Sequence, residues 1–381
     1  MTTWEIPLAD IKFDRSEIDA VVEVLQSGWL TMGSATQQFE ANFSEWNNVP
    51  HSIAVSSGTA ALHLACIAGG LGPGDEVVLP ALTFVATANA VRYTGATPVF
   101  ADIQSLDDLT ISPESIRSKI TSNTKAIIVM HYAGYPCQMA EIQQIAYQHN
   151  LLVIEDAAHA IGAELNGKMM GTVGDIGCFS FFSNKNLVTG EGGMITTRDP
   201  EIAQRLRHLR SHGMSTLTWD RHKGHAFSYD VVDLGYNYRL DEIRAALGIS
   251  QLNKLAPNNQ IRRSLTRYYH HQLAEKCPQI TVPFSDHPGT TAAHIMPVLL
   301  PENIHRQSVM EHLKANRIQT SIHYPPITGF SNYREEFKQR PILPRTDYVA
   351  EKELTLPLFP TMTTAQIDRV VDCLVEGLER R

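Results

Sequence analysis

The stretch Leu151-Leu152-Val153-Ile154-Glu155-Asp156-Ala157-Ala158-His159-Ala160 contains four consecutive apolar residues followed by two acids. Such an apolar run is typical of a central parallel strand that is covered on both faces. Open α/β sheets bind their ligands at the carboxyl ends of such strands. We therefore expect Asp156 at the mouth of a binding site, where the small alanines beside it leave room for a flat molecule.

Further short apolar segments alternate with helical patterns along the first two thirds of the chain. We expect strands at residues 52–55, 76–79, 98–101, 126–130, 151–154 and 194–197, and helices at 59–68 and 139–149. Asp199 and Pro200 predict the start of another helix. This alternation predicts an α/β fold with a mostly parallel sheet and helices on both faces.

The pattern changes near residue 255. A long helix from about Asp241 leads to a strand at 295–300, a helix at 306–315 and a terminal helix with the capping pair Thr363 and Gln366. One face of the terminal helix is apolar: Ile367, Val370, Val371, Leu374 and Leu378. We expect a large domain over residues 1–255 and a smaller α+β domain over residues 256–381.

A second segment places one lysine between an apolar run and a glycine-rich turn: Ser180-Phe181-Phe182-Ser183-Asn184-Lys185-Asn186-Leu187-Val188-Thr189-Gly190-Glu191-Gly192-Gly193. Burying a lysine ammonium is costly unless the group loses its proton or finds a partner. A desolvated lysine can lose its proton and attack a carbonyl as an amine. The alternative is that Lys185 reaches water and has no chemical role, as most lysines do.

Asp156 and Lys185 together suggest the cofactor pyridoxal phosphate. Lys185 would hold the cofactor as a Schiff base, for which its amine must be neutral. Asp156 would keep the pyridine nitrogen protonated, so that the ring can accept electrons from a carbanion.

One rival is a phosphate loop at Gly162-Ala163-Glu164-Leu165-Asn166-Gly167-Lys168. Met169 stands where a hydroxyl residue would hold magnesium, and the motif should follow an early strand and open a helix. Asn166-Gly167 instead predicts a tight type I′ hairpin turn. We therefore reject a nucleotide-hydrolase site.

Five segments, in their order and spacing, resemble the DegT/DnrJ/EryC1/StrS family of sugar aminotransferases, in the fold-type I group of pyridoxal-phosphate enzymes. They are Ser57-Gly58-Thr59-Ala60-Ala61-Leu62, residues 80–90, residues 155–159, the Lys185 segment, and Gly235-Tyr236-Asn237-Tyr238-Arg239. The similarity covers nearly the whole chain. It implies a fold-type I aminotransferase, with a seven-stranded type of sheet in the large domain.

The resemblance implies roles in holding the cofactor. Gly58 and Thr59 open a helix whose free N–H groups suit the phosphate, and Ser180 resembles the phosphate-binding serine. Phe84 resembles the aromatic that stacks on the ring, and His159 the residue that meets the phenolic oxygen. Without the resemblance, these residues would be read as a glycine turn and ordinary core or surface side chains.

The resemblance also implies a homodimer with shared active sites, because Asn237 matches a residue that reaches the phosphate of the neighbouring subunit. Tyr324 and Arg239 are expected on the substrate side. Two positions depart from the family pattern: Thr328 where many relatives have histidine, and Met32 where a small polar residue is common. Both lie in stretches that resemble loops near the substrate, so the identity of the acceptor sugar does not follow from the resemblance.

The implied reaction takes an amino group from a donor, by analogy glutamate, to a keto-sugar. We expect this sugar to be attached to a nucleoside diphosphate and to carry its keto group at C3 or C4. Lys185 would move the proton at the substrate carbon. Some relatives replace the lysine with histidine and dehydrate the sugar, so Lys185 favours transamination. The alternatives are a keto-cyclitol acceptor and a non-catalytic sensor that only binds the cofactor.

Composition excludes several other classes. The net charge of −8 gives no indication of the basic surface that binds nucleic acid, so we expect no nucleic-acid partner. No apolar stretch reaches the roughly 18 residues of a membrane span, and the start resembles no signal peptide. The five scattered cysteines predict reduced thiols in a cytoplasmic protein. His222 and His225 lack a third ligand, so we expect no metal site and read them as loop residues.

Overall fold

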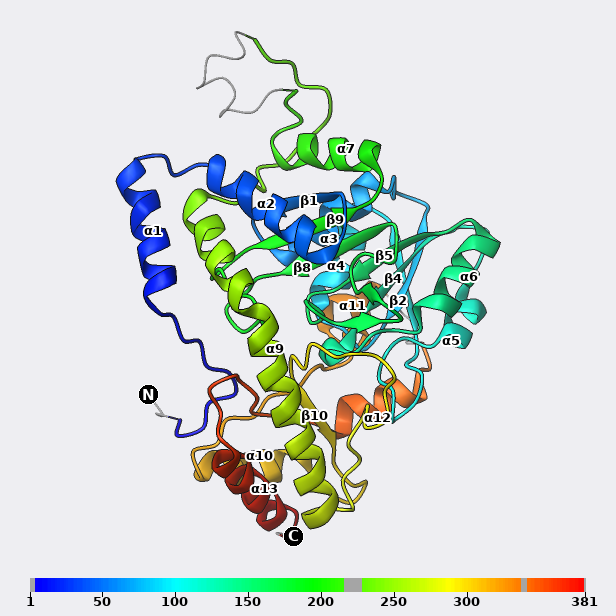
Figure 1. Cartoon of the computed structure of the whole chain (residues 1–381). Helices are drawn as coiled ribbons and strands as arrows, with labels where there is room; N and C mark the ends of the chain where they lie inside the picture. Colours follow the sequence, from blue (N-terminus) through cyan, green and yellow to red (C-terminus); the bar gives the residue numbers. More distant parts are fainter. Residues whose placement is uncertain (1–3, 216–227, 337–340, 380–381) are drawn as a thin grey trace.

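A seven-stranded sheet forms the centre of the larger part of this computed structural model, which describes residues 4–215, 228–336 and 341–379 (Figure 1). The strand order is β1-β9-β8-β5-β4-β2-β3, in which β9 is antiparallel to both neighbours and the other pairs are parallel. The strands are β1 His51–Val55, β2 Glu76–Pro80, β3 Thr97–Ala101, β4 Thr124–Met130, β5 Leu152–Asp156, β8 Ile176–Ser180 and β9 Gly193–Thr197. The predicted α/β fold with a mostly parallel sheet is confirmed, and the strand bounds agree within two residues.

Helices cover both faces of this sheet, which explains why its strands are continuous apolar runs. One face carries α3 Gly58–Ala68, α4 Val85–Tyr93 and α7 Pro200–Arg210, and the other carries α2 Ser34–Asn47, α5 Pro113–Lys119, α6 Met139–His149 and the first part of α9 Glu242–Lys276. Successive strand residues alternate between the two cores: Ile53 and Val55 belong to one and Ala54 to the other.

The C-terminal part packs around the second half of α9 (Figure 1). It contains β10 Met296–Leu299 paired with β11 Glu353–Leu356, and the helices α10 Arg306–Ala315 and α13 Thr364–Glu379. Two further helices pack elsewhere: Tyr333 of α11 Ser331–Glu336 lies in the core on the α3 and α4 face of the sheet, and Val349 of α12 Pro344–Lys352 lies in a separate apolar cluster. The predicted apolar face of α13 is buried, and Gln366 N–H donates to Thr363 Oγ1 as the capping pair predicts. The predicted domain boundary at residue 255 falls inside α9, and the division stays a prediction.

Two smaller features complete the larger part of the molecule: a hairpin at the rejected phosphate-loop segment, and the N-terminal helix. Asn166 and Gly167 join the two short strands β6 Glu164–Leu165 and β7 Lys168–Met169, and both have positive φ angles, 53° and 74°. The stretch is therefore a hairpin and not a phosphate loop. Near the N-terminus, α1 Arg15–Ser27 lies beside α9, where Lys254 donates to Glu17.

Candidate active site

A cavity of about 500 Å³ lies at the carboxyl ends of β4, β5 and β8. Eight of the predicted site residues line it: Gly58, Thr59, Phe84, Asp156, His159, Ser180, Lys185 and Tyr324. Parallel strands bring these ends to one edge of the sheet, so residues far apart in the chain meet there. Asn237 and Arg239 do not belong to this lining.

Lys185 is the only basic side chain other than histidine among the described residues that line the cavity. It follows β8 in a turn that is closed by its own N–H, which donates to Phe182 O at 2.9 Å. Desolvation lowers the pKa of Lys185 to about 8, although the nearby Asp156 opposes this shift. An amine with this pKa is substantially neutral in mildly alkaline solution, as a nucleophile requires.

Asp156 ends β5 and is only 4% exposed. Thr87 Oγ1 donates to its Oδ2 at 2.7 Å, and the Ala158 N–H donates to its Oδ1 at 3.1 Å. Burial raises the pKa of Asp156, while Thr87, Ala158 and Lys185 act in the opposite direction. A positive charge on a bound ring would stabilise this carboxylate.

Thr87 is part of the site although no pattern in the sequence indicates it. It belongs to α4, and its hydroxyl also lies 2.8 Å from that of Thr83. The stretch 80–90 resembles the family, but a threonine in a helix carries no signal of a carboxylate partner 69 residues away.

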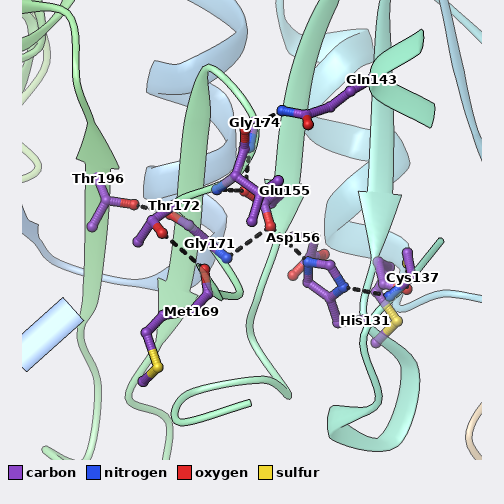
Figure 2. A network of polar contacts seen from close by, with 12 residues as sticks. His131, Cys137, Gln143, Glu155, Asp156, Met169, Gly171, Thr172, Gly174 and Thr196 are labelled. Atoms are coloured by element: carbon purple, nitrogen blue, oxygen red, sulfur yellow. Dashed lines mark hydrogen bonds and ion pairs between the residues drawn. The ribbon is translucent and has the colours of Figure 1, made fainter. Parts of the chain in front are cut away.

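Glu155, the neighbour of Asp156, belongs to a separate polar network (Figure 2). Its carboxylate lies 2.9 Å from His131 Nε2, and it accepts from the N–H groups of Gly171, Val173 and Gly174. The Cys137 N–H donates to His131 Nδ1, so His131 carries its proton on Nε2 and donates to Glu155. This network fixes the end of β5 to the 171–174 loop.

The N-terminus of α3 forms a cradle next to Ser180. The first N–H groups of a helix have no partner within it, and together with a hydroxyl they suit a phosphate. A Cβ at Gly58 would lie 2.8 Å from Ser180 Cβ, so only glycine allows this close approach. These donors fit the phosphate group of the expected cofactor, with Gly58 and Thr59 at the helix start.

Phe84, His159 and Tyr324 form the aromatic wall of the cavity. Phe84 is 54% exposed, which leaves a ring face available for stacking, and its centroid lies 5.8 Å from that of Tyr324. Tyr324 OH lies 2.9 Å from His159 Nε2. Burial lowers the pKa of His159 well below its usual value, so its imidazole is neutral.

The two remaining predicted residues lie outside the cavity, Asn237 on the surface and Arg239 partly buried. Asn237 is exposed, and its backbone bridges to Ser211. The Arg239 guanidinium makes no hydrogen bond or ion pair with the described residues, and burial lowers its pKa. Their roles toward a second subunit and the substrate stay predictions.

Thr328 and Met32, the two departures from the family pattern, are both buried. Within the described ranges, no three His, Cys, Asp or Glu side chains are grouped to hold a metal ion. His222 and His225 lie outside the described residues. Among the helices that the structure describes, none has the length and apolar character needed to span a bilayer.

Comparison with known proteins identifies similar chains. A model of the DegT/DnrJ/EryC1/StrS aminotransferase family matches residues 12–375. The spore coat polysaccharide biosynthesis protein SpsC of Bacillus subtilis is 38% identical over 366 residues, which cover 94% of each chain. A putative sugar aminotransferase of Streptococcus pneumoniae, solved in its PLP-form, has a TM-score of 0.90 and 27% identity over 98% of this chain and 99% of that one. DesI, solved in the presence of its TDP-sugar product, has a TM-score of 0.89 and 30% identity over 100% of this chain and 95% of that one.

Proposed function

Because the chain belongs to the DegT/DnrJ/EryC1/StrS aminotransferase family, we propose that it transfers an amino group from glutamate to a nucleotide-linked keto-sugar. The family, the fold-type I architecture and the pyridoxal-phosphate-dependent aminotransferase activity expected from the sequence are confirmed. The donor, the nucleotide and the position of the keto group, C3 or C4, belong to the proposal.

The observation that carries the proposal is the cavity shared by Lys185, with its lowered pKa, and the buried carboxylate of Asp156. Bound pyridoxal phosphate supplies an aldehyde that condenses with amines and a ring that accepts electrons from a neighbouring carbon. Lys185 would provide the neutral amine that holds it, and Asp156 would balance the positive charge of the ring nitrogen. The α3 N-terminus and Ser180 would bind the phosphate.

Lys185 also moves the proton of the reaction. With the cofactor bound, its neutral amine would take a proton from the substrate carbon and would return one, as general base and then general acid. The same group would serve both half-reactions. His159, held by Tyr324, provides a polar contact for the phenolic oxygen of the cofactor.

Binding the nucleotide of the acceptor requires positively charged side chains that the cavity of one chain does not supply. A diphosphate is bound best by arginine and lysine side chains. The described lining contains no arginine, and its one lysine, Lys185, is needed to hold the cofactor and to move the proton. Arg239 and Asn237 lie outside the cavity of their own chain and are free to reach that of a second copy. This supports a homodimer with shared active sites. DesI, whose structure contains a TDP-sugar product, supports the nucleotide-linked acceptor.

All five cysteines (Cys66, Cys137, Cys178, Cys277 and Cys373) are buried free thiols, as expected from the sequence. Unpaired thiols are typical of a reducing compartment, which supports a cytoplasmic location.

The test is a pair of half-reactions followed by the absorbance of the bound cofactor. Glutamate should convert the cofactor to its amino form, and a keto-sugar linked to a nucleoside diphosphate should convert it back. Conversion by a free keto-cyclitol, but by no nucleotide sugar, would favour the cyclitol alternative. A spectrum that does not respond to any amino donor would favour the non-catalytic sensor.

A further inference from the structure

The side chains of Asn186 and Asn259 form a buried amide cluster next to Lys185 in the chain. Asn186, the next residue, donates through Nδ2 to Asn259 Oδ1 at 2.8 Å and to Ala292 O at 2.7 Å. Asn259 Nδ2 donates in turn to Ile161 O at 2.9 Å. Because backbone carbonyl oxygens only accept hydrogen bonds, these contacts define the orientation of both amides.

The remaining polar atom of Asn186 determines the protonation of His294. Asn186 Oδ1 lies 2.9 Å from His294 Nδ1, and an amide oxygen cannot donate, so Nδ1 carries the proton. Burial lowers the pKa of His294 well below its usual value, and the imidazole is therefore neutral. Its Nε2 is an unprotonated nitrogen, buried and without a hydrogen-bond partner among the described residues.

The same imidazole packs against His159 of the cavity wall. The two ring centroids are 4.3 Å apart, with the planes tilted by 49°. The backbone of His294 is held as well, because Arg262 Nη1 of α9 donates to its carbonyl oxygen at 3.3 Å. A ring fixed at both its side chain and its backbone restricts the rotation of His159.

We infer that His294 is a positioning residue for the amino transfer. Its Nδ1–H holds the side chain of Asn186, and with it the turn that carries Lys185, while its ring holds His159. The inference rests on the proposed function, because it concerns how Lys185 and His159 are aimed at the cofactor. A packing role alone would not require a histidine, since phenylalanine would fill a similar volume.

Two substitutions separate the two contacts of His294. His294→Phe keeps a ring against His159 but removes the donor, and so leaves the oxygen of Asn186 buried and unpaired. His294→Asn keeps an N–H donor for Asn186 but removes the ring. Asn186→Ala removes all three side-chain hydrogen bonds and replaces His294→Phe if that variant does not fold.

His287→Phe is the matched control. His287 likewise has a ring nitrogen bonded to an oxygen, with its Nε2 2.9 Å from Pro136 O, but its ring contacts are Tyr135 and Phe284 instead of His159. The same chemical change is therefore made in the same part of the chain without touching the Asn186 cluster.

The first measurement is the rate at which visible absorbance appears when pyridoxal phosphate is added to each apoprotein. It is combined with kcat and KM of the holoenzyme and with the melting temperature. A 1 Å displacement of a reacting group costs up to about a hundredfold in rate. We therefore expect His294→Phe to slow cofactor capture and to lower kcat, each about tenfold, with an unchanged KM for the acceptor. His294→Asn should restore capture to within about threefold of the unchanged protein, and His287→Phe should alter neither rate.

Equal capture rates and kcat values in folded His294→Phe and the unchanged protein would overturn the inference. Folded Asn186→Ala with an unaltered capture rate would do the same. A failure of the unchanged protein itself to develop the absorbance would instead overturn the proposed function, so the two failures are distinguishable.

Discussion

Glu155 and Asp156 are consecutive residues of β5, yet their carboxylates have separate partners on opposite faces of the sheet. Glu155 is bound by His131 and by N–H groups of the 171–174 loop (Figure 2). Asp156 instead accepts from Thr87 and lines the cavity. Side chains alternate along a strand, so one step of the chain separates a structural acid from one that is available to a ligand. Substitutions at the two positions should therefore have different consequences.

Asp156→Asn should leave the fold intact and weaken the chemistry. The amide cannot balance a positive ring nitrogen, so we expect kcat to fall by about a hundredfold or more. The absorbance of the bound cofactor should also change, because the protonation of its ring changes. Steady-state rates and spectra check this, and a kcat within about twofold of the unchanged enzyme would contradict the role assigned to Asp156.

Glu155→Gln should instead destabilise the fold and leave the cofactor spectrum unaltered. The amide places an N–H group toward at least one N–H donor of the loop, which leaves buried donors unpaired. We expect a loss of about 2–4 kcal/mol of unfolding free energy. Urea denaturation of the holoenzyme measures this loss, and unchanged stability would show that the network is not needed.

The rate of cofactor capture by the apoprotein should depend on the protonation of Lys185. Desolvation lowers the pKa of this amine from 10.5 to about 8. Only the neutral amine condenses, so the rate should rise about tenfold per pH unit below that value and level off above it. Stopped-flow absorbance between roughly pH 6 and 10 records the profile. A rate that still rises steeply at the upper end would show that Lys185 is not desolvated.

Lys185→Met should stabilise the apoprotein at neutral pH while abolishing the covalent cofactor absorbance. The folded chain binds the Lys185 proton more weakly than the unfolded chain, so removing the amine removes a penalty of about 3 kcal/mol. In the unchanged apoprotein, stability should rise with pH between about 8 and 10.5, because the unfolded chain then binds more protons. Lys168→Met, at an exposed hairpin lysine, is the control and should change neither property.

Mixed dimers test whether the active sites are shared. If each site takes Lys185 from one chain and Asn237 from the other, a dimer of Lys185→Ala with Asn237→Ala contains one intact site. Random pairing of equal amounts should then restore about a quarter of the unchanged activity. Co-expression with two affinity tags isolates the mixed dimer. A mixture no more active than the average of its two parents would indicate that Asn237 serves its own chain.

Local patterns were sufficient for the strands and helices that were predicted, and for Lys185 and Asp156, although helices such as α1, α2 and α5 were not predicted. The apolar run before Asp156, the capping residues of α7 and α13 and the Asn166-Gly167 turn depend on neighbours in the chain, and the structure confirms them. The unusual setting of Lys185 was also visible, because a lone lysine stands between an apolar run and a glycine-rich turn.

The partners of these groups were not visible in the same way. Thr87 meets Asp156 across 69 residues, Asn186 meets His294 across 108, and His159 meets Tyr324 across 165. The amino-acid order thus determined which segments are strands, helices and turns, and which lysine and aspartate are chemically suited to a cofactor. Tertiary packing alone decided which buried donor meets which acceptor, because that choice depends on how the sheet edge, α9 and the C-terminal part come together in space.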